Sequence, residues 1–168
     1  MTPLDVAVDH VRGSQAGRLI VEYGDYECPY ARLAYRQIRR VEGRLGDAVR
    51  FAFRHFPLEA IHPHARAAAT AAEAAALQDR FWEMHELLFH RQSALENNDL
   101  LRYAAELSLD VRQFDADRTA AAVARRVDRD LASGIASGKV WSTPTLFIDG
   151  VVYRGAYDAG ALVEALAQ

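Results

Sequence analysis

The amino-acid sequence predicts an α/β fold: a central sheet with an all-helical subdomain inserted between its two halves. Three observations lead to this fold class. Two apolar runs, Arg18–Tyr23 and Val49–Phe56, flank a segment with helical spacing. A long stretch of helical periodicity follows, and two short strand-like runs joined at Asp149-Gly150 stand near the C-terminus.

The first half of the chain predicts a strand, a helix and a second strand. Arg18–Tyr23 is apolar and rich in β-branched residues, and Gly24 follows it. Pro29–Leu45 has apolar residues at helical spacing among arginines, and Gly46 stands just beyond its end. Because a helix joins this strand to Val49–Phe56, we expect the two strands to be parallel.

The middle of the chain predicts helices only. Apolar residues recur at helical spacing in four consecutive segments: His64–Leu77, Phe81–Phe89, the segment behind the cap candidates Asn97 and Asn98, and Val123–Leu131. Four helices in a row do not fit an alternating α/β pattern. We therefore expect a helical insertion at about residues 60–136, within a single domain that covers residues 1–168.

The C-terminal part returns to strands and ends in a helix. Asp149-Gly150 is a dipeptide typical of tight hairpin turns, and apolar runs flank it. Asp158 is placed to cap a final helix that runs through Leu166. The resulting order is strand, helix, strand, helical block, hairpin and helix.

Composition and charge exclude several classes of function. The chain has 20 basic and 23 acidic residues, a formal net charge of −3, and no basic stripe, so we expect no nucleic-acid partner. No stretch reaches the ~18 apolar residues of a membrane span, and the N-terminus lacks the apolar run of a signal peptide. We therefore expect a cytoplasmic protein, and the start at Met1 makes a piece of a larger membrane protein the less expected origin. A single cysteine excludes an intramolecular disulfide.

That cysteine, Cys28, stands at the start of a predicted helix. Pro29 is favoured at the first helical position, which makes Cys28 the cap residue. A sulfur there faces unpaired N–H groups and the positive end of the helix dipole, both of which favour the reactive thiolate. Free cysteines are also common as small buried residues, and the spacing alone leaves both interpretations open.

Around this cysteine the sequence resembles the thioredoxin-like proteins of the DsbA type, a bacterial family that includes thioredoxin domains fused to sodium/proton antiporters. The resemblance runs from about Asp9 to the C-terminus. The motifs that carry it are VEYGDYECPY at 21–30, FRHFPL at 53–58 followed by HPHA, FWEMHELLF at 81–89 and STPTLFIDG at 142–150. It implies a thioredoxin-like fold, βαβ plus ββα around a central sheet, with a helical insertion. It also implies thiol-disulfide exchange, with disulfide-containing proteins or peptides as substrates.

The family's Cys-Pro-Xaa-Cys motif is incomplete in this chain. Cys28 matches the first, attacking cysteine, whereas Ala31 stands where the family has the resolving cysteine. A mixed disulfide at Cys28 therefore persists until an external thiol arrives. Three explanations are open: a natural monothiol enzyme, loss of redox activity, or a cysteine-to-alanine change introduced to trap intermediates or prevent oxidation.

The resemblance implies roles for further residues. Pro144 matches the family's cis-proline beside the cysteine, so that Thr143 and Pro144, together with Pro29 and Tyr30, contact the substrate. Glu22 matches an acid that accepts a proton and tunes thiol ionisation. The alternative for Glu22 is a glutamate at the end of a strand that faces solvent.

Cofactors and partners follow from the same resemblance. We expect no bound cofactor, with glutathione or another small thiol as the co-substrate, and a monomer or homodimer. The competing function is a redox-inactive module that binds a peptide or a partner protein through the cis-proline groove.

The histidines do not predict a metal site. His85 and His90 are five residues apart, whereas two ligands on one helical face are usually four apart. We expect His62 and His64 to serve the N-terminus of the alanine-rich helix, and His85 to pack against Phe81. The sequence thus predicts no metal ligand.

Overall fold

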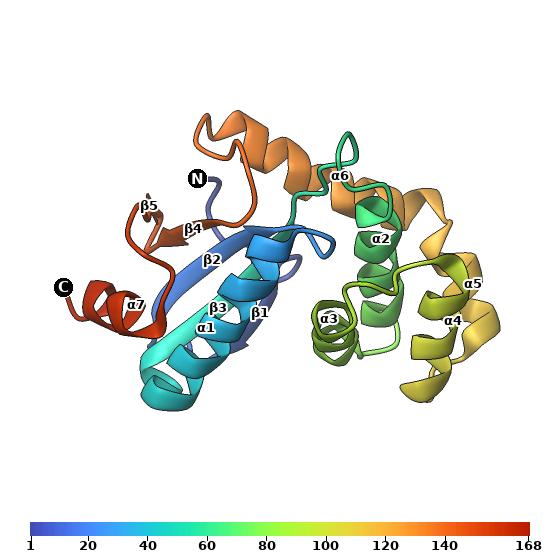
Figure 1. Cartoon of the computed structure of the whole chain (residues 1–168), viewed down its shortest axis with the longest axis horizontal. Helices are drawn as coiled ribbons and strands as arrows, with labels where there is room; N and C mark the ends of the chain where they lie inside the picture. The colour runs from blue at the N-terminus through green and yellow to red at the C-terminus, as the bar shows by residue number, and fades with distance from the viewer.

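A five-stranded sheet forms the centre of the molecule. The structure, a computed structural model, describes all 168 residues. The strands lie in the order β1-β3-β2-β4-β5 (Figure 1). Their bounds are β1 His10–Gly13, β2 Arg18–Gly24, β3 Val49–His55, β4 Thr145–Ile148 and β5 Val151–Val152. The central pair β2–β3 is parallel and every other pair is antiparallel, which confirms the predicted parallel connection.

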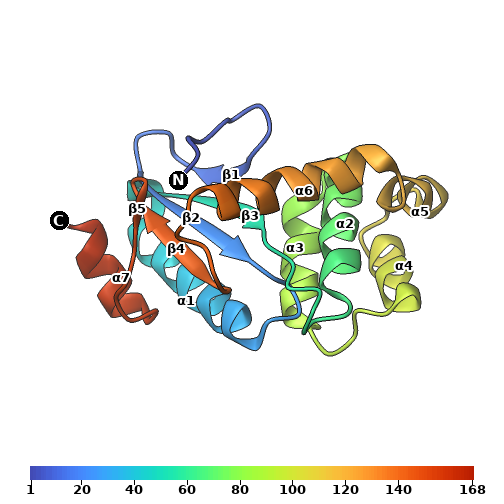
Figure 2. The same ribbon diagram turned by 90° about the horizontal axis from the view of Figure 1, so that it is seen from above.

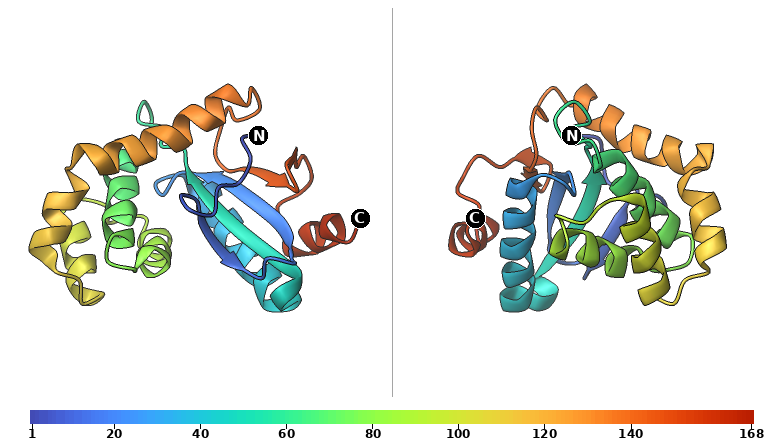
Figure 3. Two further views of the ribbon diagram at one scale, coloured as in Figure 1. Left: turned by 180° about the vertical axis from the view of Figure 1, so that it is seen from behind. Right: turned by 45° about the vertical axis from the view of Figure 1, so that its right-hand side comes forward.

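Seven α-helices surround this sheet in two groups. Their bounds are α1 Pro29–Leu45, α2 Ala65–Ala76, α3 Phe81–His90, α4 Asn97–Glu106, α5 Val111–Arg118, α6 Ala121–Ala136 and α7 Ala159–Leu166, with a short 3₁₀ turn at Gly46–Ala48. α1 and α7 lie against each other beside the sheet, whereas α2–α5 form a group at one end of it (Figures 1 and 2). α6 leaves that group and returns to the sheet (Figure 3). The predicted thioredoxin-like α/β architecture with a helical insert is confirmed.

Side chains on the two faces of the sheet belong to separate hydrophobic clusters, because successive side chains along β2 point to opposite faces. Ile20 lies in the large cluster with residues of α1, α7 and the helical group. Val21 and Tyr23 lie in a smaller cluster on the opposite face, against which Leu131 of α6 packs. Gly134 permits the close approach of α6, because a Cβ there would lie 2.8 Å from the ring of Phe56.

The sequence did not predict two of the observed elements, β1 and α5. β1 carries His10 and Arg12 and lacks a run of apolar residues, so it has no strand signature of its own; its pairing with β3 makes it a strand. α5 buries only Phe114, so its periodicity is weak, and the helical insert has five helices where four were expected.

Two predictions about helix caps have different outcomes. Asp158 caps α7, as predicted, by accepting hydrogen bonds from the N–H groups of Gly160 and Ala161. The prediction of Asn97 and Asn98 as caps of α4 is wrong. The cap is Glu96, which forms a capping box with Asp99 and places both asparagines inside the first turn.

A buried ion pair anchors the N-terminal segment to the sheet. Arg54 of β3 donates to both carboxylate oxygens of Asp9, at 3.0 and 2.8 Å, and both side chains are almost fully buried. The same guanidinium also donates to the carbonyl oxygens of Thr2 and Pro3 and to the hydroxyl of Tyr23. Removal of Arg54 leaves the buried Asp9 carboxylate with only the longer ion pair to Arg129, at 3.6 Å, and the backbone N–H of Asp5.

Arg54→Met therefore lowers the free energy of unfolding by about 3–5 kcal/mol, since the Asp9 carboxylate stays buried and loses its two shortest charged hydrogen bonds. Urea denaturation followed by circular dichroism measures the loss. The matched control is Arg66→Met, because Arg66 pairs with Glu59 and Asp128 at the surface; it costs less than about 1 kcal/mol. Equal losses in the two variants would contradict this account.

Candidate active site around Cys28

Cys28 is the N-cap of α1, as the sequence predicts. Its backbone is extended, with φ −74° and ψ 120°, and Pro29 occupies the first helical position. The side chain is 4% exposed and accepts no hydrogen bond from the first turn. Instead, the Sγ atom donates to the backbone carbonyl of Thr143 at 3.2 Å. The cysteine thus lies between the N-terminus of a helix and a loop 115 residues further along the chain.

The Thr143–Pro144 peptide bond is cis, as the family resemblance implied. The Thr143 side chain is buried and its Oγ1 atom has no hydrogen-bond partner. On the other side of the bond, Tyr157 donates its hydroxyl to the carbonyl of Pro144 at 3.2 Å. This loop leads directly into β4, whose pairing with β2 fixes it beside Cys28.

Asp25 fastens the loop between β2 and α1 to the helical insert. Its buried carboxylate accepts hydrogen bonds from the backbone N–H of Glu27 at 2.8 Å and of Leu58 at 2.9 Å, and it pairs with His62 at 2.8 Å. A second contact comes from Gln92, whose amide donates to the carbonyl oxygens of Tyr26 and Cys28 at 2.7 and 2.8 Å. The sequence analysis identified neither residue. Aspartate often accepts hydrogen bonds from backbone N–H groups in turns, so the role of Asp25 could have been predicted from its place in a loop, whereas nothing in the sequence marks Gln92.

The expectation that His62 and His64 serve the N-terminus of the alanine-rich helix is met only by backbone groups, such as the carbonyl of His64, which accepts the N–H of Ala68. α2 has no side-chain cap, although His64 stands at its N-cap position. His64 bonds Glu27 instead, through its Nδ1 atom at 2.8 Å and its backbone N–H at 2.6 Å. The carboxylates of Asp25 and Glu27 in the cysteine loop engage the Nδ1 atoms of both histidines, which are therefore not available to accept N–H groups of α2. Glu27 is therefore a tethered residue, not a freely solvated charge.

The other two histidines that were weighed as metal ligands also have different partners. His85 is fully buried, and its ring lies 5.8 Å from that of Phe81, which confirms the predicted packing. Its Nδ1 atom is 3.0 Å from the hydroxyl of Tyr26. Burial lowers the pKa of His85 well below its ordinary value, so this imidazole is neutral. His90 lies beside the hydroxyl of Tyr35.

Glu22 is fully buried in the middle of β2, which excludes the alternative of a solvent-facing glutamate at the end of a strand. Its strand neighbours are Phe53 and Leu146, so it points toward the α1 face of the sheet. Neither carboxylate oxygen has a hydrogen-bond partner. Burial therefore raises the pKa of Glu22 to about 8, although the charge of Arg12 opposes the shift. Such a carboxyl group is protonated at pH 7 and can exchange a proton near that pH.

A cavity of about 720 Å³ opens beside the cis-proline. Tyr30 and Pro144 line it, as expected for substrate contacts, and the exposed side chain of Leu33 extends its apolar wall. Ala31, at the place of the family's resolving cysteine, is completely buried. The cavity lining also includes Thr143, a predicted substrate contact, Asp158, predicted only as a helix cap, and residues that sequence reasoning assigned no role: Ala34, Gln37, Ser142, Ala156 and Tyr157.

Comparisons with known proteins identify the family. A thioredoxin family model matches residues 6–168. The chain belongs to the thioredoxin family. Among curated proteins it is 46% identical over 98% of its length to the Na(+)/H(+) antiporter NhaA of Herminiimonas arsenicoxydans, and 43% identical over 99% to an NhaA of Mycolicibacterium vanbaalenii. The chain covers only 26% and 27% of these relatives. This agrees with the resemblance to thioredoxin domains fused to antiporters.

Solved structures share the fold of this thioredoxin-family chain over nearly its whole length. A thioredoxin-like oxidoreductase from Silicibacter pomeroyi superposes with a TM-score of 0.82 at 25% identity, covering 95% of this chain and 90% of the other. BdbD from Bacillus subtilis superposes with a TM-score of 0.84 at 22% identity, covering 97% and 93%. These neighbours confirm the thioredoxin-like fold with its helical insert. None of the helices here has the length and hydrophobicity of a membrane span.

The buried Glu22 makes stability depend on pH. The pKa of its carboxyl group is about 8 in the folded protein and 4.5 when the group is exposed, so the unfolded state loses its proton first as pH rises. Glu22 therefore destabilises the fold progressively between about pH 4.5 and pH 8, by up to about 4–5 kcal/mol. Above pH 8 this contribution stays constant.

We expect Glu22→Gln to remove this dependence. Urea denaturation at pH 5 and pH 8.5 measures it, and the difference between variant and parent in free energy of unfolding grows with pH in favour of the variant. Parallel pH profiles for the two proteins would show that Glu22 titrates normally.

Proposed function

We propose that this chain is a monothiol thiol-disulfide oxidoreductase with Cys28 as the nucleophile and a small thiol of the glutathione class as the second substrate. One observation carries the proposal: the sulfur of the only cysteine lies at a helix N-terminus and 3.2 Å from the carbonyl that precedes a cis-proline. Membership of the thioredoxin family supports it.

The chemistry proceeds in two exchanges. The Cys28 thiolate attacks one sulfur of a mixed disulfide between a substrate thiol and glutathione, forms a Cys28–glutathione disulfide, and releases the substrate as a thiolate. A second glutathione thiolate then attacks the sulfur of the bound glutathione. Oxidised glutathione leaves, and Cys28 returns as a thiolate. In sum, one mixed disulfide and one glutathione thiol become one substrate thiol and one oxidised glutathione, so the incoming glutathione is the reductant.

Ala31 is the reason for a monothiol cycle. A methyl group cannot resolve the mixed disulfide, so the second thiol must come from solution. The cavity beside Pro144 offers room for that thiol or for the substrate, since its volume of about 720 Å³ is in the usual range for small-molecule sites. Tyr30 and Leu33 present apolar surface at its rim.

Glu22 supplies the proton exchange in this proposal. The carboxyl group points to the sheet face that α1 covers, the face from which Cys28 projects at the start of that helix. A carboxyl with a pKa of about 8 releases and accepts protons readily at cellular pH. In this proposal the Glu22 carboxyl group transfers the proton of the Cys28 thiol to and from solvent when a mixed disulfide forms or breaks.

Thr143 and Pro144 form the docking edge for the substrate. The Thr143 carbonyl accepts the Cys28 thiol, and its backbone leads into β4, so an extended peptide can add hydrogen bonds along this edge. Pro29 holds the first turn of α1 in helical geometry and donates no hydrogen bond, so it does not compete for the sulfur.

We expect the purified protein to catalyse release of glutathione from a glutathionylated peptide. Cys28→Ser reduces the rate to the uncatalysed background, because a hydroxyl group is not ionised at neutral pH. Formation of oxidised glutathione, coupled to NADPH consumption by glutathione reductase, measures turnover. Intact-mass analysis after a brief reaction shows one glutathione per chain in the parent only. A binding module without redox activity gives no turnover and no adduct, yet retains peptide affinity.

Restoring the second cysteine tests whether the surrounding site is catalytic. Ala31→Cys creates a Cys-Pro-Tyr-Cys sequence and is expected to reduce insulin disulfides with dithiothreitol at a rate well above that of the parent. The matched control is Ala34→Cys, which places a thiol at an equally buried position of α1 one turn further on. A gain in neither variant, or an equal gain in both, would argue against a preformed dithiol site.

A further inference from the structure

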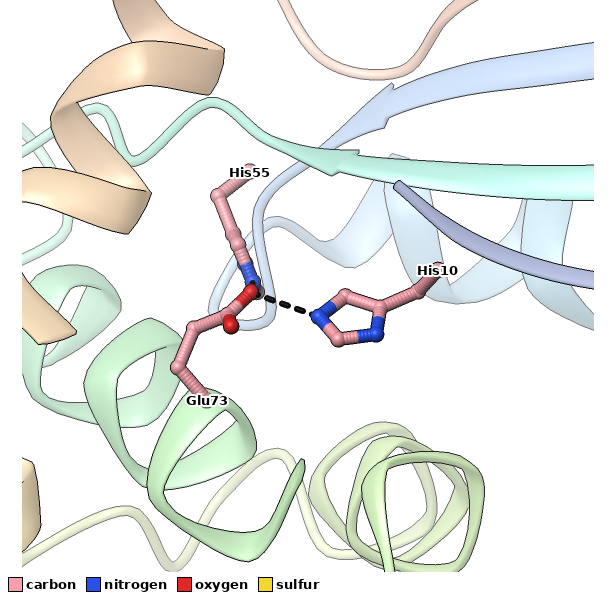
Figure 4. Close-up of side chains that lie close together, drawn as sticks. All are labelled: His10, His55 and Glu73. Atoms are coloured by element: carbon pink, nitrogen blue, oxygen red, sulfur yellow. Dashed lines mark hydrogen bonds and ion pairs between the residues drawn. The ribbon is translucent and has the colours of Figure 1, made fainter. Parts of the chain in front are cut away.

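A second group of reactive side chains lies outside the cysteine site. His10 of β1, His55 at the end of β3 and Glu73 of α2 point toward one another from three separate elements (Figure 4). The Nε2 atoms of both histidines lie 2.8 Å from the same oxygen, Oε1 of Glu73. The three atoms that could ligate a metal all lie within 4.8 Å of one another.

The surroundings fix the orientation of this group. The ring of His10 stacks on Phe81 with ring centroids 3.4 Å apart and planes 9° from parallel. His55 meets the ring of Phe53 edge-on, at 5.4 Å. The exposed fractions of the three side chains are 16% for His10, 1% for His55 and 6% for Glu73. These side chains are therefore held in place without a bound ligand, which limits the entropy that a ligand must overcome.

Glu73 supplies the carboxylate of this group, and both histidine Nε2 atoms lie within hydrogen-bond distance of its Oε1 atom. Burial alone favours the neutral acid, but the hydrogen bonds of His10 and His55 outweigh it and lower the pKa of Glu73 well below its ordinary value. The group offers one carboxylate and two imidazole nitrogens, which is the donor set of zinc sites with three protein ligands.

We propose that His10, His55 and Glu73 form a binding site for a divalent transition-metal ion, with Zn²⁺ as the ion that the ligand set fits best. Tetrahedral zinc holds nitrogen and oxygen ligands at about 2.0–2.1 Å, which places them about 3.3 Å apart. The nitrogen–oxygen distances are now 2.8 Å. Tetrahedral coordination therefore requires these two distances to widen by about half an ångström, with the two Nε2 atoms, now within 4.8 Å of each other, also settling at about 3.3 Å.

The fourth coordination position has access to solvent. His10 and Glu73 line a cavity of about 320 Å³ whose walls also include Val8 and Leu77. Arg126 lies on the same wall, with Nε 3.9 Å from Oε2 of Glu73 and Nη1 2.6 Å from Asp130. A water molecule or a small anion can complete the tetrahedron from this cavity, since Arg126 makes the cavity favourable for negative charge.

Metal binding exchanges two hydrogen bonds for three metal–ligand bonds. Each Nε2 atom loses its hydrogen bond to Glu73 and donates its lone pair to the ion, and each imidazole then carries its proton on Nδ1. No proton is released when both rings begin neutral. The ion links edge strand β1 and central strand β3 to α2, so it clamps the helical insert to the sheet.

The site is independent of the proposed redox function. Cys28 is not among the ligating atoms, so zinc binding can be measured in the Cys28→Ser variant, which removes the thiol as a competing ligand. Failure of the exchange assay leaves this proposal unaffected, and failure of zinc binding leaves the redox proposal unaffected.

The test is calorimetric titration of the EDTA-treated Cys28→Ser protein with Zn²⁺. We expect one ion per chain and, at free zinc about 100 times the dissociation constant, a rise of roughly 5–10 °C in the unfolding midpoint. Co²⁺ as a probe is expected to give the intense visible absorption of tetrahedral coordination, which a purely structural histidine–glutamate cluster does not produce.

Two variants locate the site. Glu73→Gln and His10→Gln each remove one ligand and keep a polar side chain of similar size, and each weakens zinc binding at least about tenfold, since even outer-shell losses cost about 10–100-fold. The matched control is His90→Gln, which removes a histidine outside the group and leaves binding unchanged. Midpoints measured in EDTA show whether the variants fold. Absence of saturable binding by the folded parent, or equal affinity in all variants, overturns the proposal.

Discussion

The contact between the Cys28 sulfur and the Thr143 carbonyl is the constraint around which the molecule is arranged. It joins residues 115 positions apart, so both partners must be delivered by rigid elements. Central strand β2 ends just before the cysteine, and its antiparallel partner β4 begins just after the cis-proline. Because the two strands pair over Ile20–Tyr23, the helix N-terminus and the proline loop meet at the same edge of the sheet. The remaining elements support this junction.

The helical insert contributes directly to that support. Gln92, which follows α3, binds the carbonyl of Cys28 itself, and His62, which precedes α2, binds Asp25 in the same loop. Each contact restrains a segment that would otherwise be a surface loop. The insert is therefore part of the scaffold of the cysteine site, and a change in the packing of α2 or α3 is transmitted to the sulfur through these two hydrogen bonds.

The sequence predicted the parts of this arrangement that depend on local chemistry. Proline after cysteine, Asp149-Gly150 in the hairpin and Asp158 before α7 each act on residues a few positions away, so their outcomes followed from neighbours alone. The family resemblance supplied Pro144. No local sequence pattern, in contrast, predicts contacts between segments that are far apart in the chain. Gln92 is an ordinary glutamine in the sequence, and His10, His55 and Glu73 have no spacing that relates them, because they meet only after three elements pack.

Two buried glutamates show how the same residue type acquires opposite properties. Glu22 has no hydrogen-bond partner, so burial raises its pKa and it stays neutral at pH 7. Glu73 is also buried, yet two imidazoles donate to one of its oxygens, and its pKa is lowered. The first is an uncharged acid at pH 7 that becomes a carboxylate only at higher pH. The second holds a permanent negative charge between two nitrogens, which suits a cation. Burial alone thus does not decide what a carboxylate does; the donors that folding brings to it do.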